Sequence, residues 1–220
     1  MQLLKSNVGR KILMALTGIF MVLFAVVHLL GNSSIFAGQN GINAYAEHLH
    51  SLGPVVWIFR LAMLGLLLVH VIFGIQLTLE NSAASPQDYA VVRHVRATLS
   101  SKNMIWTGLL IAVFIIYHLL HFTVRATPGL VLGFDAQQRF DVFTMVVSSF
   151  SGPLNVLIYV AAMIVLFLHL FHGIQSFFQT MGWSNSCTLP VITKAGRLVA
   201  AVLLIGYVSI PVVIMAGILK

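Results

Sequence analysis

The stretch Leu154–Phe178, LNVLIYVAAMIVLFLHLFHGIQSFF, decides the fold of this chain. It is about 25 residues long and contains no Lys, Arg, Asp or Glu, so at 1.5 Å per residue it can cross the roughly 30 Å hydrocarbon core of a bilayer. Yet it contains His169 and His172. A metal-binding side chain inside a membrane span is costly, so these histidines indicate a functional site.

Two motifs of the chain occur twice, each beginning with a histidine. The pairs are His70-Val-Ile-Phe-Gly74-Ile-Gln76 with His169-Leu-Phe-His-Gly173-Ile-Gln175, and His28-Leu-Leu with His118-Leu-Leu. The four leading histidines therefore form two matched pairs, carried by four different apolar spans.

The composition predicts an all-α, multi-pass membrane protein. Of its 220 residues 59% are hydrophobic and 8% charged, and the mean hydropathy is +0.99. We expect a single transmembrane domain over residues 1–220, a four-helix core with one further helix, with spans at about 12–31, 54–79, 103–124, 153–178 and 195–219. The net charge of +7 does not indicate nucleic acid binding, because the basic residues lie at the ends of spans.

The single cysteine, Cys187, excludes a disulfide framework and an iron–sulfur cluster held by this chain alone. The first span lacks a following cleavage-site pattern, so we expect it to remain as a signal anchor. We also expect loops at residues 32–51 and 182–194, and a short interfacial helix from Asp141 to Ser149.

The basic residues predict the orientation. One side carries eight of them, Lys5, Arg10, Lys11, Arg93, Arg96, Lys102, Lys194 and Arg197, and the other carries Arg60, Arg125, Arg139 and Lys220. The positive-inside rule therefore places the N-terminus in the cytoplasm and the C-terminus outside. Counting along each span puts His28 and His118 toward the outer face and His70 and His169 toward the cytoplasmic face.

Two imidazoles at one depth on different helices can ligate both axial positions of a haem iron, and a four-helix core can hold such a cofactor. Gly74 and Gly173 lie one turn after a histidine, where small residues would admit a flat macrocycle. His121 and His172 each lie three residues after a proposed ligand and remain alternative ligands. Zinc, di-iron or transport chemistry fits less well, because the spans lack Asp and Glu.

Across essentially its whole length the chain resembles the five-helix, di-haem cytochrome b anchor of succinate:quinone and quinol:fumarate oxidoreductases. The resemblance depends on the order and spacing of several short motifs: Arg10-Lys11, His28-Leu-Leu-Gly-Asn32, Ser51-Leu52, His70-x-x-x-Gly74, Tyr117-His118 and His169-x-x-x-Gly173-x-x-Ser176-Phe177. The cytochrome b anchor of a hydrogenase or formate dehydrogenase, and a haem-free anchor or transporter, are the alternatives.

The resemblance implies that His28 and His118 ligate a distal haem b, and His70 and His169 a proximal haem b. It implies a bacterial cytoplasmic (inner) membrane location, with a flavoprotein subunit and an iron–sulfur subunit docked on the cytoplasmic side. It also implies that a quinone, commonly menaquinone, reacts near the distal haem.

By position, the candidates for the quinone region are Asn43, Glu47, His48, His50, Arg60 and the turn at 148–152. Glu47 is the candidate for proton exchange with the quinone, although an acid in a wet loop is commonly only solvated. Another set of basic residues would meet proximal haem propionates, the docked partner or lipid head groups: Arg10, Lys11, Lys102 and Lys194.

The chain departs from some di-haem members at Phe167, two positions before His169, where those members carry an acidic residue proposed to move protons across the membrane. Proton transfer by that route is therefore not expected here.

Overall fold

The computed structural model describes residues 6–84 and 103–220, and these are almost entirely helical. The elements are α2 (Asn7–Asn32), a 3-10 turn η1 (Ser33–Ala37), α3 (Gly38–Ser51), α4 (Pro54–Ala83), α6 (Met104–His118), a π-helical segment η2 (Leu119–Thr123), α7 (Val142–Phe150), α8 (Pro153–Thr180) and α9 (Leu189–Met215). Only a single isolated bridge, Phe134 with Phe140, adds extended structure to the described residues.

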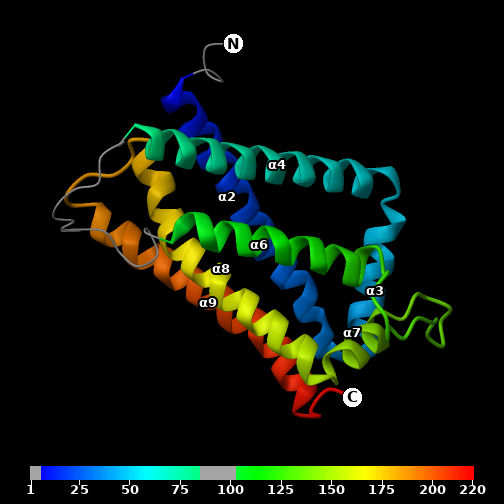
Figure 1. Cartoon of the computed structure of the whole chain (residues 1–220). Helices are drawn as coiled ribbons and strands as arrows, with labels where there is room; N and C mark the ends of the chain where they lie inside the picture. The colour runs from blue at the N-terminus through cyan, green and yellow to red at the C-terminus, as the bar shows by residue number, and fades with distance from the viewer. Residues whose placement is uncertain (1–5, 85–102) are drawn as a thin grey trace.

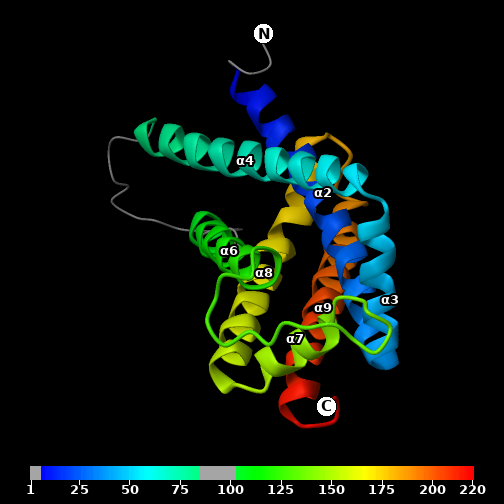
Figure 2. The ribbon, with the colours of Figure 1, turned by 90° about the vertical axis from the view of Figure 1, so that its right-hand side faces the viewer.

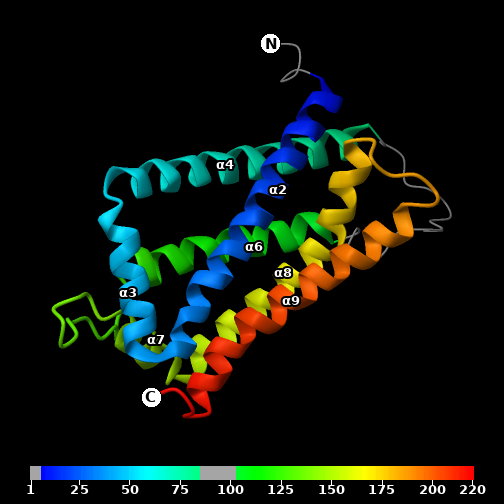
Figure 3. The ribbon, with the colours of Figure 1, turned by 180° about the vertical axis from the view of Figure 1, so that it is seen from behind.

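Five helical stretches in the described residues are long and apolar enough to cross a membrane, which confirms the predicted all-α, five-span class. They are α2, α4, α6 with η2, α8 and α9 (Figure 1). Four of them form a ring, in which α4 packs on α2, α2 on α8, α8 on α6 and α6 on α4 (Figure 2). The fifth, α9, lies outside the ring and runs along α8 (Figure 3).

The two ends of the bundle differ. At one end, called here the N-terminal end, α2 begins, α4 and α8 finish, and α6 and α9 begin (Figure 1). At the other, called the C-terminal end, lie α3, α7, the connection at 124–141 and the end of the chain. The charge pattern predicts that the N-terminal end faces the cytoplasm.

Local sequence explains where most helices begin. The Ser6 hydroxyl accepts a hydrogen bond from the N–H of Gly9 at 3.0 Å, and the Asp141 carboxylate accepts one from the N–H of Thr144 at 3.1 Å. Proline occupies the first turn of α4, α8 and α9, where its missing N–H is not needed. The short helix predicted from Asp141 to Ser149 is confirmed as α7, Val142–Phe150.

Two predicted loops are wrong in part: residues 182–188 lie outside the helices, as expected, but residues 38–51 and 189–194 are helical. Residues 38–51 form α3, because Ile42 packs in the core and Asn43 is bonded to a distant part of the chain. Helix α9 begins at Leu189 because proline is accommodated in its first turn, so Lys194 lies within the helix.

The chain is built from two similar halves. In the first, the long helix α2 is followed by the short α3 and the long α4. In the second, α6 is followed by the short α7 and the long α8. The repeated histidine motifs of the sequence fall at corresponding places in these halves, so the two members of each pair are structurally equivalent.

Helix α9 is held by close contacts with the ring. At Gly206, an added Cβ would lie 2.5 Å from Leu29 Cδ2, and at Gly196 it would lie 3.1 Å from Ile174 Cγ2. These glycines therefore allow α9 to approach α2 and α8. Phe167 packs against a buried hydrophobic cluster that joins α2, α8 and α9 and consists of Leu29, Leu170, Ile174, Ala200 and Leu203.

Candidate functional site

The rings of His70 on α4 and His169 on α8 face each other toward the N-terminal end of the ring of four helices. Their centroids are 6.3 Å apart, and the ring planes are inclined at 68°. Residues that are 99 positions apart in the sequence therefore meet at one level, as the spacing along the spans predicts.

Hydrogen bonds fix the tautomer of both rings. The Nδ1 atom of His70 lies 3.0 Å from the carbonyl oxygen of Met14, which can only accept, so Nδ1 carries the proton. The Nδ1 atom of His169 lies 3.1 Å from the hydroxyl of Thr107, which itself donates to backbone carbonyls of its own helix. In both rings, Nε2 is therefore left with a lone pair that can bind a metal.

Thr17 and Gly18 on α2 support His70 in the same way that Thr107 and Gly108 on α6 support His169. The Thr17 hydroxyl lies 3.3 Å from His70 Nδ1. An added Cβ would lie 3.1 Å from His70 Cε1 at Gly18 and 3.3 Å from His169 Cε1 at Gly108, so both rings lie directly on a glycine.

These four residues were not predicted from the sequence, although a signal for them exists. Met14-Ala-Leu-Thr17-Gly18 is repeated as Met104-Ile-Trp-Thr107-Gly108. In each copy the histidine of the same helix, His28 or His118, follows the threonine by eleven residues. The repeat therefore includes the residues that hold the imidazoles as well as the imidazoles themselves.

The second pair, His28 on α2 and His118 at the end of α6, lies toward the C-terminal end. Its ring centroids are 5.9 Å apart, with planes inclined at 86°. Phe24 stacks on His28 with a centroid distance of 5.2 Å. The hydroxyl of Tyr159 lies 3.2 Å from His118 Nδ1. Because His70 contacts Thr17, eleven residues before His28, the two pairs lie about 16 Å apart along the bundle.

Both pairs fit a metal held from two sides. A ligating imidazole nitrogen lies about 2.0–2.1 Å from its metal and about 1.1 Å from its own ring centre, so two opposed imidazoles have centroids about 6.3 Å apart. The observed values are 6.3 and 5.9 Å. Among the residues described, no three His, Cys, Asp or Glu side chains gather at one metal position. Two opposed imidazoles are a ligand set that could hold a haem iron from both sides.

His121 and His172, the alternative ligands, are not part of either facing pair of rings. His121 is 2% exposed, and its Nδ1 lies 3.1 Å from the Tyr159 hydroxyl. His172 shows no ring contact with His70, whereas His169 does. An added Cβ at Gly74 would lie 3.9 Å from Met14 Sδ, and at Gly173 it would lie 3.4 Å from Met104 Cε, so these glycines face the neighbouring helix one turn beyond each histidine.

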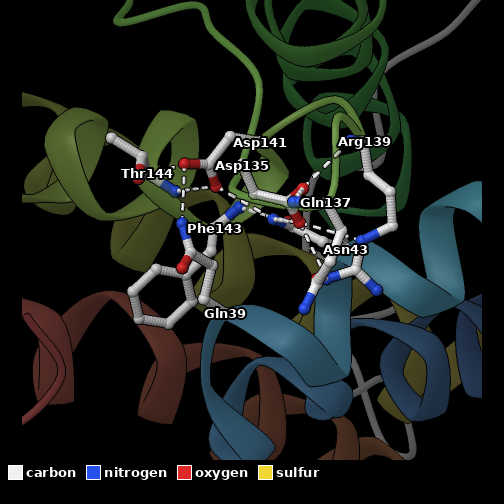
Figure 4. Close-up of polar contacts among 8 residues, drawn as sticks. All are labelled: Gln39, Asn43, Asp135, Gln137, Arg139, Asp141, Phe143 and Thr144. Atoms are coloured by element: carbon white, nitrogen blue, oxygen red, sulfur yellow. Dashed lines mark hydrogen bonds and ion pairs between the residues drawn. The ribbon is translucent and has the colours of Figure 1, made fainter.

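A buried polar network closes the C-terminal end (Figure 4). Asn43, which is 0% exposed, donates to Asp135 Oδ2 and Asp141 Oδ1, each at 3.1 Å, and accepts from the N–H of Phe143 at 3.0 Å. Arg139 donates to Asp135 at 2.8 Å. Asn43 therefore joins α3 to the connection at 124–141 and to the start of α7, and its role in the quinone region stays a prediction.

The two carboxyl groups of this network are shifted toward the charged form. Burial raises the pKa of Asp135, but hydrogen bonds from Arg139, Asn43 and Gln137 outweigh burial and hold the pKa well below its usual range. Burial likewise raises the pKa of Asp141, and hydrogen bonds from Thr144, Asn43 and Gln39 lower it by more.

The other quinone candidates lie on the surface of the C-terminal end. Glu47, His48 and His50 are exposed in the last turns of α3, and His50 Nδ1 lies 2.8 Å from the Ala46 carbonyl. Arg60 is exposed in the second turn of α4, with its guanidinium 5.0 Å from the Trp57 ring. In the turn at 148–152, Ser149 is buried and donates to its own helix.

Arg125, which was not among the candidates, lies near Arg60. Its backbone φ is 62°, and its guanidinium carbon is 3.8 Å from the Phe140 ring centroid. Burial and then the nearby charge of Arg60 lower the pKa of Arg125. Arg60 and Arg125 therefore lie near each other at the C-terminal end, the same end that carries the exposed acid and histidines of α3.

The basic residues of the N-terminal end divide into paired and exposed ones. Arg10 forms an ion pair with Glu80 at 2.5 Å, joining the start of α2 to the end of α4. Lys11 and Lys194 are exposed. Lys102 lies outside the described residues.

The fold and these pairs define a multi-pass helical membrane protein with two levels of opposed histidines. The family model for the succinate dehydrogenase/fumarate reductase transmembrane subunit matches residues 79–210, more than half of the chain. The chain therefore belongs to this family. Neither the curated proteins nor the solved structures gave a match.

The matched region includes His118 and His169 but not His28 and His70. The internal repeat is what relates the unmatched first half to the matched second half.

Proposed function

We propose that this chain is a di-haem cytochrome b anchor of a succinate:quinone or quinol:fumarate oxidoreductase. His70 and His169 hold one haem b, and His28 and His118 hold the other. The observation that carries the proposal is the pair of centroid distances, 6.3 and 5.9 Å, between imidazoles at equivalent places in two halves of the chain.

Haem b, when bound, supplies a one-electron redox centre at each level. The protein's own contribution is to fix each imidazole. The Met14 carbonyl and the hydroxyls of Thr17 and Thr107 hold protons on Nδ1, so that Nε2 points its lone pair away from these partners. Two histidines at each level would hold the iron from both sides, and such a centre would serve electron transfer and not oxygen binding.

Quinone chemistry, with menaquinone as the expected substrate, is assigned to the C-terminal end. Glu47, His48 and His50 are exposed there and can exchange protons with the quinone oxygens, while Arg60 offers hydrogen-bond donors. The assignment is supported by the position of these residues, which lie at the same end of the bundle as the His28–His118 pair.

The flavoprotein and iron–sulfur subunits are assigned to the opposite end, which the positive-inside rule predicts to be cytoplasmic. The membrane that the resemblance implies is the bacterial cytoplasmic membrane. Exposed Lys11 and Lys194 lie at that end and are available to a docked partner. The whole chain then acts as one transmembrane cytochrome b domain that passes electrons between the two ends.

The test is a set of single substitutions in protein purified from a host with ample haem. Wild type should show two b-type haems in its reduced-minus-oxidised spectrum. His70→Ala and His169→Ala should lose the same haem, and His28→Ala and His118→Ala the other. His50→Ala is the exposed control and should keep both. If all four ligand variants retain both haems, the assignment is wrong. If His172→Ala loses a haem and His169→Ala does not, the ligand on α8 is His172, one turn further along the helix.

A further inference from the structure

Tyr159 on α8 packs against His118, with ring centroids 5.9 Å apart. It is 8% exposed, and its hydroxyl lies 3.2 Å from His118 Nδ1 and 3.1 Å from His121 Nδ1. The two histidines belong to one helical stretch, and the tyrosine belongs to its neighbour in the ring. A single hydroxyl therefore joins one proposed haem ligand to a buried second histidine.

The backbone changes its winding at this point. His118 is the last residue of α6, and His121 lies in the π-helical segment η2, where the N–H of Val124 donates to the Leu119 carbonyl at 2.7 Å. Such π-helical turns are rare and occur often at functional sites. His121 is 2% exposed and stacks on Phe122 with a centroid distance of 4.1 Å, so its ring is held in place by packing.

Counting protons fixes the direction of the chain of hydrogen bonds. A hydroxyl has one proton, so Tyr159 can donate to only one of the two imidazoles. A histidine that ligates a metal through Nε2 keeps its proton on Nδ1, so His118 must donate to the Tyr159 oxygen. The buried Tyr159 hydroxyl still needs an acceptor for its own proton, and its other hydrogen-bond contact in the described residues is Nδ1 of His121, so we assign that proton to His121 Nδ1 and the proton of the His121 ring to Nε2.

This arrangement is not shared by the other three ligands. His70 and His169 meet a backbone carbonyl and threonine hydroxyls from α2 and α6. In the described part of the chain, the His28 ring has no hydrogen bond. Of the four proposed ligands, only His118 is bonded to a tyrosine whose own proton is directed to a second histidine.

We propose that Tyr159 and His121 are positioning residues that set the redox potential of the haem at the His28–His118 level. The proposal rests on the haem assignment above. A ligand imidazole that donates its Nδ1 proton becomes a better electron donor and favours the oxidised metal. His121 strengthens the effect because it accepts the Tyr159 proton and leaves the Tyr159 oxygen free to accept from His118. The pair thus lowers the potential of one haem and not of the other.

The experiment is a potentiometric titration of both haems, followed by optical and electron paramagnetic resonance spectra, in wild type and Tyr159→Phe. Removing the acceptor should change the oxidised-to-reduced ratio of the affected haem three- to tenfold, a rise in midpoint potential of about 30–60 mV. The haem at the His70–His169 level should keep its potential. Thr107→Val is the matched control. It should shift the midpoint potential of the haem at the His70–His169 level and leave the other potential unchanged.

His121 provides an independent pair of variants should Tyr159→Phe fail to assemble. His121→Leu removes the acceptor and should raise the potential of the same haem, whereas His121→Asn offers an oxygen near the position of Nδ1 and should restore part of the shift. Two haems whose potentials are both unchanged in Tyr159→Phe, or in His121→Leu, would overturn the inference, as would equal shifts of both. A wild-type protein without haem would instead overturn the proposed function.

Discussion

Replacing Asn43 tests whether the buried network at the C-terminal end holds α3 to the second half of the chain. The side chain is 0% exposed and forms hydrogen bonds to Asp135, Asp141 and the N–H of Phe143, all at 3.0–3.1 Å. Asn43→Ala removes all three bonds at once and has no atoms to replace them.

The expected loss of stability follows from these bonds. Leaving the buried N–H of Phe143 without a partner costs about 1–3 kcal/mol. Losing each of the two bonds to a carboxylate costs about 0.5–1.5 kcal/mol, because both carboxylates keep other donors. The sum is about 2–6 kcal/mol, which corresponds to a fall in melting temperature of about 5 °C or more for a chain of this length.

The assay is thermal unfolding in detergent, combined with limited proteolysis of the connection at 124–141. Asn40→Ala is the matched control, because Asn40 is exposed on the same helix and should melt like wild type. Gln39→Ala, which removes one bond to Asp141, should fall between the two. An Asn43→Ala protein that melts together with Asn40→Ala would refute the reasoning.

Three further perturbations have defined outcomes. Gly18→Ala would place a methyl carbon 3.1 Å from His70 Cε1. Such overpacking costs about 1–3 kcal/mol, so the variant should retain less haem at the His70–His169 level, as measured by its visible spectrum. Gly65→Ala, with nothing within 4 Å of the added carbon, is its control. Because the pKa values of Asp135 and Asp141 are lowered in the folded state, their contribution to stability is present above the ordinary pKa of about 3.9 and is lost as the pH falls below it. The melting temperature should therefore drop between pH 4 and pH 2. Asp135→Asn should make that drop smaller. Glu80→Gln breaks the partly exposed ion pair with Arg10 and should cost about 1 kcal/mol or less, a difference that high salt should reduce in thermal unfolding.

The spans and the histidine pairing could be predicted from the sequence because their signals are local. A stretch such as Leu154–Phe178 without charge has few structures open to it besides a membrane helix. Counting residues along the spans placed His70 level with His169, and the structure brings these rings together.

Helix α3 and the residues behind the imidazoles were missed because their roles depend on distant parts of the chain. Asn43 is buried by partners 92 and 98 positions away, and no pattern within residues 38–51 indicates them. Thr17 and Thr107 act on histidines of neighbouring helices, so only the repeat in the sequence, and not helical periodicity, points to them.

We propose that each imidazole pair holds one iron between its two rings. Anomalous scattering at the iron edge, from crystals of the purified protein, tests this most directly. We predict two iron peaks about 16 Å apart, one between His70 and His169 and one between His28 and His118. Crystals that show no iron, or iron at other side chains, would contradict it.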